Sequence, residues 1–182
     1  MAAIRVALLR GVNVGGRNRL SMGDLRRSML DLGFERVETY IQSGNVIFGT
    51  DEADDDSVAG LIEDAIARDH GLTVSVIVRA VDDLRAATAS NPFTRDEDDH
   101  AKLLVVFLAD EAAPAAVAEL EPERFVPDRF AVIGREIFCH YPSGSGRSKM
   151  TIDYFERILD SRATARNMRT LSKLVDRIDA AS

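Results

Sequence analysis

Hydrophobic residues recur along the chain in two patterns, continuous or alternating runs typical of strands and wider spacings typical of amphipathic helices. Residues 4–9 form a short apolar run that predicts a buried strand. Residues 21–33 carry apolar side chains at helical spacing between Ser21, a helix-capping residue type, and Gly33, a helix-stop residue type. By the same reasoning we predict strands at residues 37–42 and 46–48 joined by a tight turn, a helix that follows the acidic residues 51–56 and ends at His70, and a strand at residues 72–78.

The second half shows a similar succession of patterns. We predict a helix over residues 81–88, a strand over 102–108, a helix over 112–120, a hairpin of residues 129–133 and 136–141, and helices that begin at Thr151 and at Thr164. Residues 1–80 therefore have the order βαββαβ, which is the ferredoxin-like order. Residues 81–182 read βαββα, with a helix where the last strand would stand. We expect an α+β fold of two ferredoxin-like subdomains packed as one body, the second incomplete and ending in extra C-terminal helices.

Composition narrows the class of protein. The 182 residues are 46% hydrophobic, carry a net charge of -7 and include one cysteine, Cys139. This content supports a real core, and the acidic balance argues against wholesale coating of nucleic acid or of an anionic membrane. A single cysteine forms no internal disulfide framework and fits a reducing compartment. No apolar run is long enough to span a membrane, so we expect a cytoplasmic protein without a membrane partner.

Basic residues are segregated more sharply than the net charge suggests. Residues 10–19, 143–152 and 161–175 contain no acid, yet they hold nine of the 23 lysines and arginines. Two of these segments are glycine-containing loops that lead into predicted helices, and the third contains a predicted helix start. Free N–H groups at a helix start favour an anion, arginine adds planar donors, and glycine lets the backbone approach a ligand.

The pattern predicts a composite site for a small phosphate- or carboxylate-bearing ligand, a nucleotide included. Its candidate residues are Arg10, Asn13, Gly15, Gly16, Arg17, Gln42, Ser43, Asn45, Arg147, Lys149, Arg166, Asn167 and Arg169. The alternative is that the arginines are solvated or pair with surface acids, and that the glycines and asparagines only shape turns. The spacing of Gly11, Gly15 and Gly16 matches neither a dinucleotide fingerprint nor a Walker loop.

No catalytic or metal-binding group follows from the sequence. Cys139 and His140 are neighbours on a predicted strand, so their side chains point to opposite faces, and Cys139 is expected in the core. The histidines at positions 70, 100 and 140 lack the spacing of metal ligands and are expected at the surface or in turns. We therefore name no catalytic residue, metal or cofactor, and an enzymatic activity stays open.

Five segments of the chain resemble the bacterial family catalogued as domain of unknown function 1697. They are residues 7–16, 40–48, 91–93, 146–149 and 164–170. The resemblance implies two ferredoxin-like subdomains and no established activity. Most of these segments are also the glycine, asparagine and arginine segments chosen above, so the resemblance favours a shared ligand site. One departure is Met168, where the family pattern implies Trp.

Two other functions compete with a ligand site. A ferredoxin-like sheet can bind nucleic acid by stacking bases on aromatic side chains, but Tyr40 is the one aromatic residue that we place on the polar side of a central strand. The chain can also be an interaction module that dimerises through a sheet edge or face, with the basic loops incidental. Either a monomer or a homodimer is compatible with the sequence.

Overall fold

The structure is a computed structural model that describes residues 2–181. The chain divides into two compact units. The first unit runs to Leu84 and resumes at Arg177, and the second covers Arg85–Asp176. Each has a four-stranded antiparallel sheet, so the fold is of the mixed α+β class. None of the helices within residues 2–181 has the length and apolar character needed to cross a membrane.

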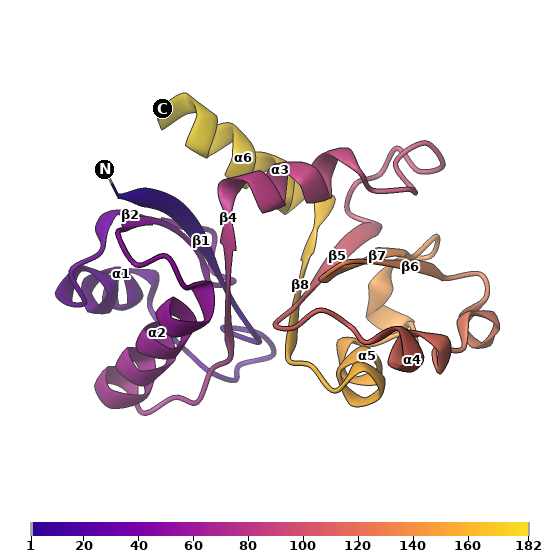
Figure 1. The fold of residues 1–182 in the computed structure, drawn as a ribbon, viewed down its shortest axis with the longest axis horizontal. Coiled ribbons are helices and arrows are strands. Elements are labelled where there is room, and N and C mark those ends of the chain that lie inside the picture. Colours follow the sequence, from indigo (N-terminus) through magenta and orange to yellow (C-terminus); the bar gives the residue numbers. More distant parts are fainter. Residues whose placement is uncertain (1, 182) are drawn as a thin grey trace. The chain divides into compact units, whose positions relative to one another are not determined.

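The first unit follows the predicted order of elements. Its sheet has the strand order β2-β3-β1-β4, and helices α1 and α2 lie on the same face of this sheet (Figure 1). The elements are β1 (Ala3–Leu9), α1 (Met22–Asp31), β2 (Glu35–Tyr40), β3 (Asn45–Thr50), α2 (Asp55–His70) and β4 (Val76–Ala80).

Local signals set the ends of the two helices. The Ser21 hydroxyl accepts a hydrogen bond from Asp24 N at the start of α1, as the capping pattern predicts. The Asp54 carboxylate accepts one from Ser57 N at the start of α2. Gly71 ends α2 in the left-handed conformation, with φ of 65°, which a residue without Cβ adopts at little cost.

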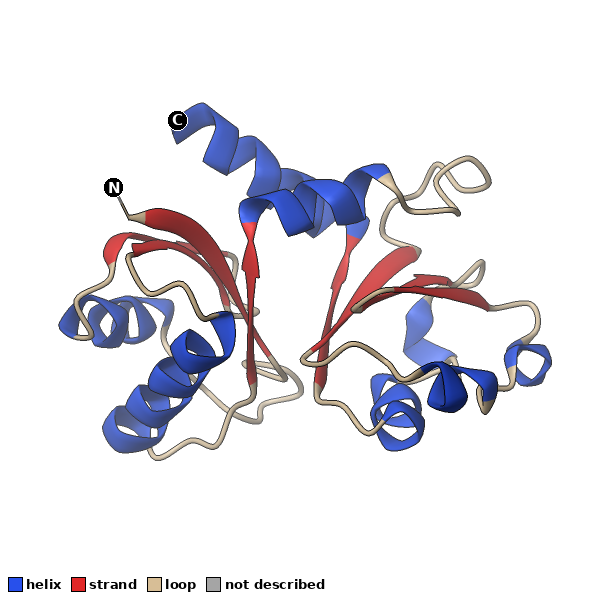
Figure 2. Cartoon of the chain, viewed as in Figure 1, coloured by secondary structure: helices blue, strands red, loops and turns tan. Residues whose placement is uncertain are grey.

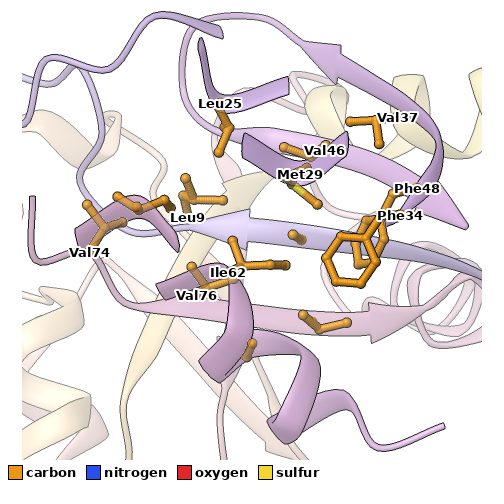
Figure 3. Close-up of a cluster of buried hydrophobic side chains, with 14 of the residues drawn as sticks. Leu9, Leu25, Met29, Phe34, Val37, Val46, Phe48, Ile62, Val74 and Val76 are labelled. Carbon is orange, nitrogen blue, oxygen red and sulfur yellow. The ribbon is translucent and has the colours of Figure 1, made fainter. Parts of the chain in front are cut away.

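The core of the first unit lies between its sheet and its two helices. Figure 3 shows Leu25 and Met29 from α1 and Ile62 from α2 pointing toward side chains of the strands. The Phe34 and Phe48 rings are in contact, with centroids 4.8 Å apart. Burial of these apolar side chains is the main stabilising contribution to this unit.

The second unit has the same strand arrangement, with the order β6-β7-β5-β8, and helices α4 and α5 lie on one face of its sheet (Figures 1 and 2). Its elements are β5 (Leu103–Leu108), α4 (Pro114–Ala118), a 3₁₀ turn η1 (Pro122–Phe125), β6 (Arg129–Ile133), β7 (Glu136–His140), a 3₁₀ turn η2 (Ser145–Arg147), α5 (Ile152–Leu159) and β8 (Ala163–Asn167). The boundaries between the two units lie within two helices, α3 (Val81–Ala89) and α6 (Met168–Ala181).

The prediction of a helix that begins at Thr164 is wrong. Residues Ala163–Asn167 form strand β8, which pairs antiparallel with β5, and Thr164 lies opposite Phe107. Helix α6 begins at Met168, and the Asn167 side chain accepts a hydrogen bond of 2.8 Å from Thr170 N. The cap is therefore three residues later than expected, and the second unit also has the complete order βαββαβ.

The turn between β2 and β3 leaves no room for a side chain at Gly44. This residue has φ of 74°, and a Cβ atom built on it would lie 2.7 Å from Leu9 Cβ. The Gly44 carbonyl also accepts a hydrogen bond of 2.9 Å from Leu9 N. Asn45 beside it is fully buried, and its amide donates to Tyr40 O and to the Ser43 hydroxyl. The Ser43-Gly44-Asn45 turn is thus fixed by its contact with the end of β1.

We expect Gly44→Ala to lower the free energy of unfolding by roughly 3 kcal/mol, because it adds a left-handed alanine to an overpacked contact. Urea unfolding followed by circular dichroism measures this loss. Gly146→Ala is the matched control, since a Cβ at Gly146 would meet no atom within 4 Å. Equal stability of the Gly44→Ala variant and the wild type would contradict this account of the turn.

Candidate functional site

The residues predicted to bind a ligand fall into two groups, one in each unit. Arg10, Asn13, Gly15, Gly16, Arg17, Gln42, Ser43 and Asn45 belong to the first unit, and Arg147, Lys149, Arg166, Asn167 and Arg169 belong to the second. The convergence of the two groups stays a prediction, which the binding experiment below tests.

The tip of the loop formed by residues 10–19, called the arginine loop from here on, is a miniature hairpin. Arg17 N donates to Val14 O at 3.0 Å, and Asn13 N donates to Asn18 O at 3.1 Å. Gly15 and Gly16 between them have φ of 58° and 78°. Positive φ at both central residues is the signature of a type I′ turn, which glycine adopts most easily. The glycine spacing therefore serves a hairpin rather than a phosphate-binding loop before a helix.

The Asn13 side chain holds this hairpin in place. Its amide nitrogen donates to Leu20 O and to Gln42 O, both at 2.8 Å, and its oxygen accepts from Leu20 N at 2.9 Å. The bond to Gln42 joins the arginine loop to the β2–β3 turn. Both N–H donors of Asn13 are engaged within the fold, so its contribution to a site is to position the loop.

The arginine loop is electropositive in a protein with a net charge of -7. Arg17 and Arg19 are exposed. Among the ion pairs of residues 2–181, neither side chain has an acidic partner. Of the two forms of the alternative, pairing with surface acids does not apply to these two arginines within residues 2–181, whereas solvated arginines fit their exposure.

Ile41, next to Gln42 in the adjoining turn, has an unusual backbone conformation. Its φ is 49°, and its side chain is 48% exposed. A β-branched residue in the left-handed region is a genuine outlier, and such strain costs on the order of 1–3 kcal/mol. Hydrogen bonds on either side keep the Ile41 backbone in this conformation, since Tyr40 O accepts from Asn45 and Gln42 O accepts from Asn13.

In the second unit, the glycine-containing loop of residues 142–149, which follows β7, contributes to an open cavity of about 480 Å³. Arg147 lines this cavity together with Asp128, which lies outside the acid-free segment of the sequence. The Ser148 hydroxyl donates to Asp128 Oδ2 at 2.5 Å. A segment without acids in the sequence therefore does not produce a surface without acids here, and the nearby carboxylate weakens the attraction of Arg147 for an anion.

Three of the remaining candidates of the second unit, Arg166, Asn167 and Arg169, have partners within the fold. Arg166 is buried on β8, and its guanidinium donates to Ala165 O at 2.8 Å and to the Thr164 hydroxyl at 3.0 Å. Burial lowers the pKa of Arg166 to about 10, so the side chain remains charged at neutral pH. Asn167 caps α6, and Arg169 pairs with Asp99 at 3.2 Å. Lys149 is exposed.

Cys139 and His140 point to opposite faces of β7, as predicted. Cys139 is buried in the core, and desolvation raises the pKa of its thiol to about 12, so it is no thiolate nucleophile at neutral pH. The expectation that His140 lies at the surface is wrong, because it is 5% exposed. Its Nδ1 lies 3.0 Å from Arg129 and its Nε2 lies 3.2 Å from Glu97. Since arginine only donates, Nδ1 accepts and Nε2 carries the proton.

Ser28 of α1 contacts Asp69 and His70 of α2, an association that no spacing in the sequence predicts. The Ser28 hydroxyl donates to Asp69 Oδ2 at 2.7 Å, and its oxygen lies 3.0 Å from His70 Nε2. Its single proton goes to the carboxylate, so His70 cannot act as a base toward it. The three side chains tie two helices together and do not form a catalytic triad. In the part of the chain that the structure describes, no cluster of three or more metal-ligating side chains occurs.

The position of Tyr40 differs from the prediction. Its strand, β2, is an edge strand of the sheet and not a central one. The Arg177 guanidinium lies 4.9 Å from the centre of the Tyr40 ring. One face of this ring is therefore occupied, which disfavours base stacking at this position.

We expect Asn13→Ala to lower the free energy of unfolding by about 2 kcal/mol, since it leaves Leu20 and Gln42 without their side-chain partner. Chemical denaturation measures the change, and amide hydrogen exchange at residues 13–18 should become faster. Asn18→Ala is the matched control, because the Asn18 amide makes one longer bond, 3.3 Å to Gly11 O. Equal effects of the two substitutions would contradict the special role of Asn13.

Comparison with known proteins identifies the family. A family model described as a protein of unknown function, DUF1697, matches residues 3–138, which include the arginine loop and the β2–β3 turn. The conserved bacterial protein SP0830 from Streptococcus pneumoniae shares the fold, with a TM-score of 0.67 and 23% sequence identity over 97% of this chain and 98% of that one. A comparison with curated proteins found no match. The chain therefore belongs to the DUF1697 family of proteins of unknown function.

Proposed function

We propose that this protein binds a small anionic ligand, bearing a phosphate or a carboxylate, through the arginine loop. The observation that carries this proposal is the pair of exposed arginines, Arg17 and Arg19, that lack an acidic partner within residues 2–181. A guanidinium without an internal partner offers its planar set of N–H donors to an anion, and two parallel bonds to a phosphate or carboxylate are stronger than neutral ones.

The backbone of the loop supports the same proposal. Gly15 and Gly16 are exposed, so a ligand can approach the main chain closely at this turn. Asn13 keeps the loop in one conformation through three hydrogen bonds. A preformed loop loses little conformational entropy when it binds, which favours affinity for a small ligand.

Two side chains of the second unit, Arg147 and Lys149, are the further candidates for contact with the ligand. Arg147 and Lys149 are exposed and, among the described residues, have no acidic partner, although Asp128 lines the same cavity as Arg147. In the composite form of the site, these two residues contact the ligand held by the arginine loop. Arg166, Asn167 and Arg169 have roles within their own unit, and in the composite form of the site the two arginines would contribute mainly through charge.

We also infer that both units are ferredoxin-like domains, on the basis of their shared order βαββαβ and their matching strand arrangement. Cys139, the single cysteine of the sequence, is buried and forms no disulfide within the chain, which fits a reducing compartment and supports a cytoplasmic location.

A thermal-shift titration with inorganic phosphate, citrate and adenosine monophosphate tests the anion site. We expect the wild type to unfold at a higher temperature in millimolar ligand, because a ligand that binds only the folded state stabilises it. A double variant, Arg17→Gln with Arg19→Gln, should lose most of this shift. Arg27→Gln is the matched control, since Arg27 is an exposed arginine of the same unit that pairs with Asp24.

A second double variant, Arg147→Gln with Lys149→Gln, separates the two forms of the proposal. A reduced shift supports the composite site, whereas an unchanged shift restricts the ligand to the arginine loop. Absence of stabilisation of the wild type by every anion would refute the proposal. Salt-dependent binding of a single-stranded oligonucleotide without binding of the small anions would favour the nucleic-acid alternative.

A further inference from the structure

We infer that the ligand is an organic anion whose apolar group packs against Ile41 and Val14, beside the arginines that hold its charged group. This inference rests on the proposed anion site and names the chemical class of its ligand. The class is a phosphate or carboxylate attached to an aryl or alkyl group.

The first observation is the exposure of two large apolar side chains on two segments that a hydrogen bond joins. Val14 is 63% exposed and Ile41 is 48% exposed. Each lies one residue from the hydrogen bond of 2.8 Å that joins Asn13 Nδ2 to Gln42 O. Consecutive Cα atoms are about 3.8 Å apart, so both apolar residues begin close to this bond. Val14 is also the hairpin partner of Arg17, which places an apolar group beside an unpaired charge.

The second observation is the strain at Ile41. An exposed turn residue with φ of 49° is most easily glycine or asparagine, because both tolerate the left-handed region. Isoleucine at this position costs stability and gains little burial in return, since half of its side chain remains exposed. Backbone strain of this kind is typical of functional sites, where a side chain is retained for its contact with a ligand.

The two observations together favour an anion that carries an apolar group over an inorganic anion. Inorganic phosphate would satisfy Arg17 and Arg19 and leave Ile41 in water. An anion with an apolar group satisfies the arginines and also buries Ile41 and Val14, and the hydrophobic gain follows the area removed from water. The arginine loop thus favours such a ligand over its inorganic counterpart.

Calorimetric titration of the full chain with phenyl phosphate and with inorganic phosphate tests this inference. We expect phenyl phosphate to bind about tenfold more tightly, the effect of burying a small apolar area. Ile41→Asn should abolish the preference and leave the affinity for inorganic phosphate unchanged. Leu61→Asn is the matched control, because Leu61 is an apolar residue of the same unit, 47% exposed, on a helix away from the loop.

Thermal unfolding of the same variants checks the strain independently. Relief of strain at Ile41→Asn should raise the unfolding midpoint by roughly 2–4 °C without ligand, which also shows that the variant is folded. A lower midpoint would contradict the strain and overturn the inference.

The binding results separate the inference from the proposed function. Equal affinities for the two phosphates, or a preference that Ile41→Asn leaves intact, would overturn the inference while the anion site stands. Absence of binding of both phosphates, together with absence of stabilisation by citrate, would overturn both. Sedimentation with phosphatidylglycerol vesicles, without binding of phenyl phosphate, would assign the apolar contact to a membrane surface and overturn the inference of a free ligand.

Discussion

The amide group of Asn13 is the contact on which the arrangement of the arginine loop depends. It bonds to Leu20, just before helix α1, and to Gln42 in the β2–β3 turn. Asn13 and Gln42 are 29 residues apart in the chain. This bridge fixes the base of the glycine turn, together with the backbone hydrogen bonds of the hairpin. Gly44 performs the matching task on the other side, since it lets the turn pack against Leu9. Two residues of modest size thus position a loop whose charged side chains remain available to solvent.

The fold of the first unit was predictable because its signals are local. Apolar spacing, the Ser21 cap and the Gly71 stop each act within one or two helical turns, and the structure places α1 and α2 accordingly. Strand β8 was missed because its sequence, Ala163-Thr164-Ala165-Arg166-Asn167, is neither β-branched-rich nor apolar. Its pairing with β5 supplies the strand conformation, and the propensity of the segment itself does not reveal it.

Charge placement was predictable only in part, for a related reason. A loop without acids in the sequence can meet an acid from elsewhere, as the cavity shared by Arg147 and Asp128 shows. Arg169 likewise pairs with Asp99, 70 residues earlier. The hydrogen-bond partners of His140 are Glu97 and Arg129, and no sequence spacing rule connects these three positions. The arginine loop differs within the described residues, because neither Arg17 nor Arg19 forms an ion pair with an acidic side chain there.

The two units also share a feature that the sequence conceals. The fourth residue of β4 and the fourth residue of β8 are both buried arginines, Arg79 and Arg166, each paired with a valine on the adjacent strand. In both cases the guanidinium donates to the carbonyl of the preceding residue. Such arginines belong to the fold, since a buried charge persists only where polar partners compensate its desolvation. Arg17 and Arg19 have the same chemistry but no such constraint, so exposure and pairing, rather than the number of arginines, separate the arginines available to solvent from those that belong to the fold.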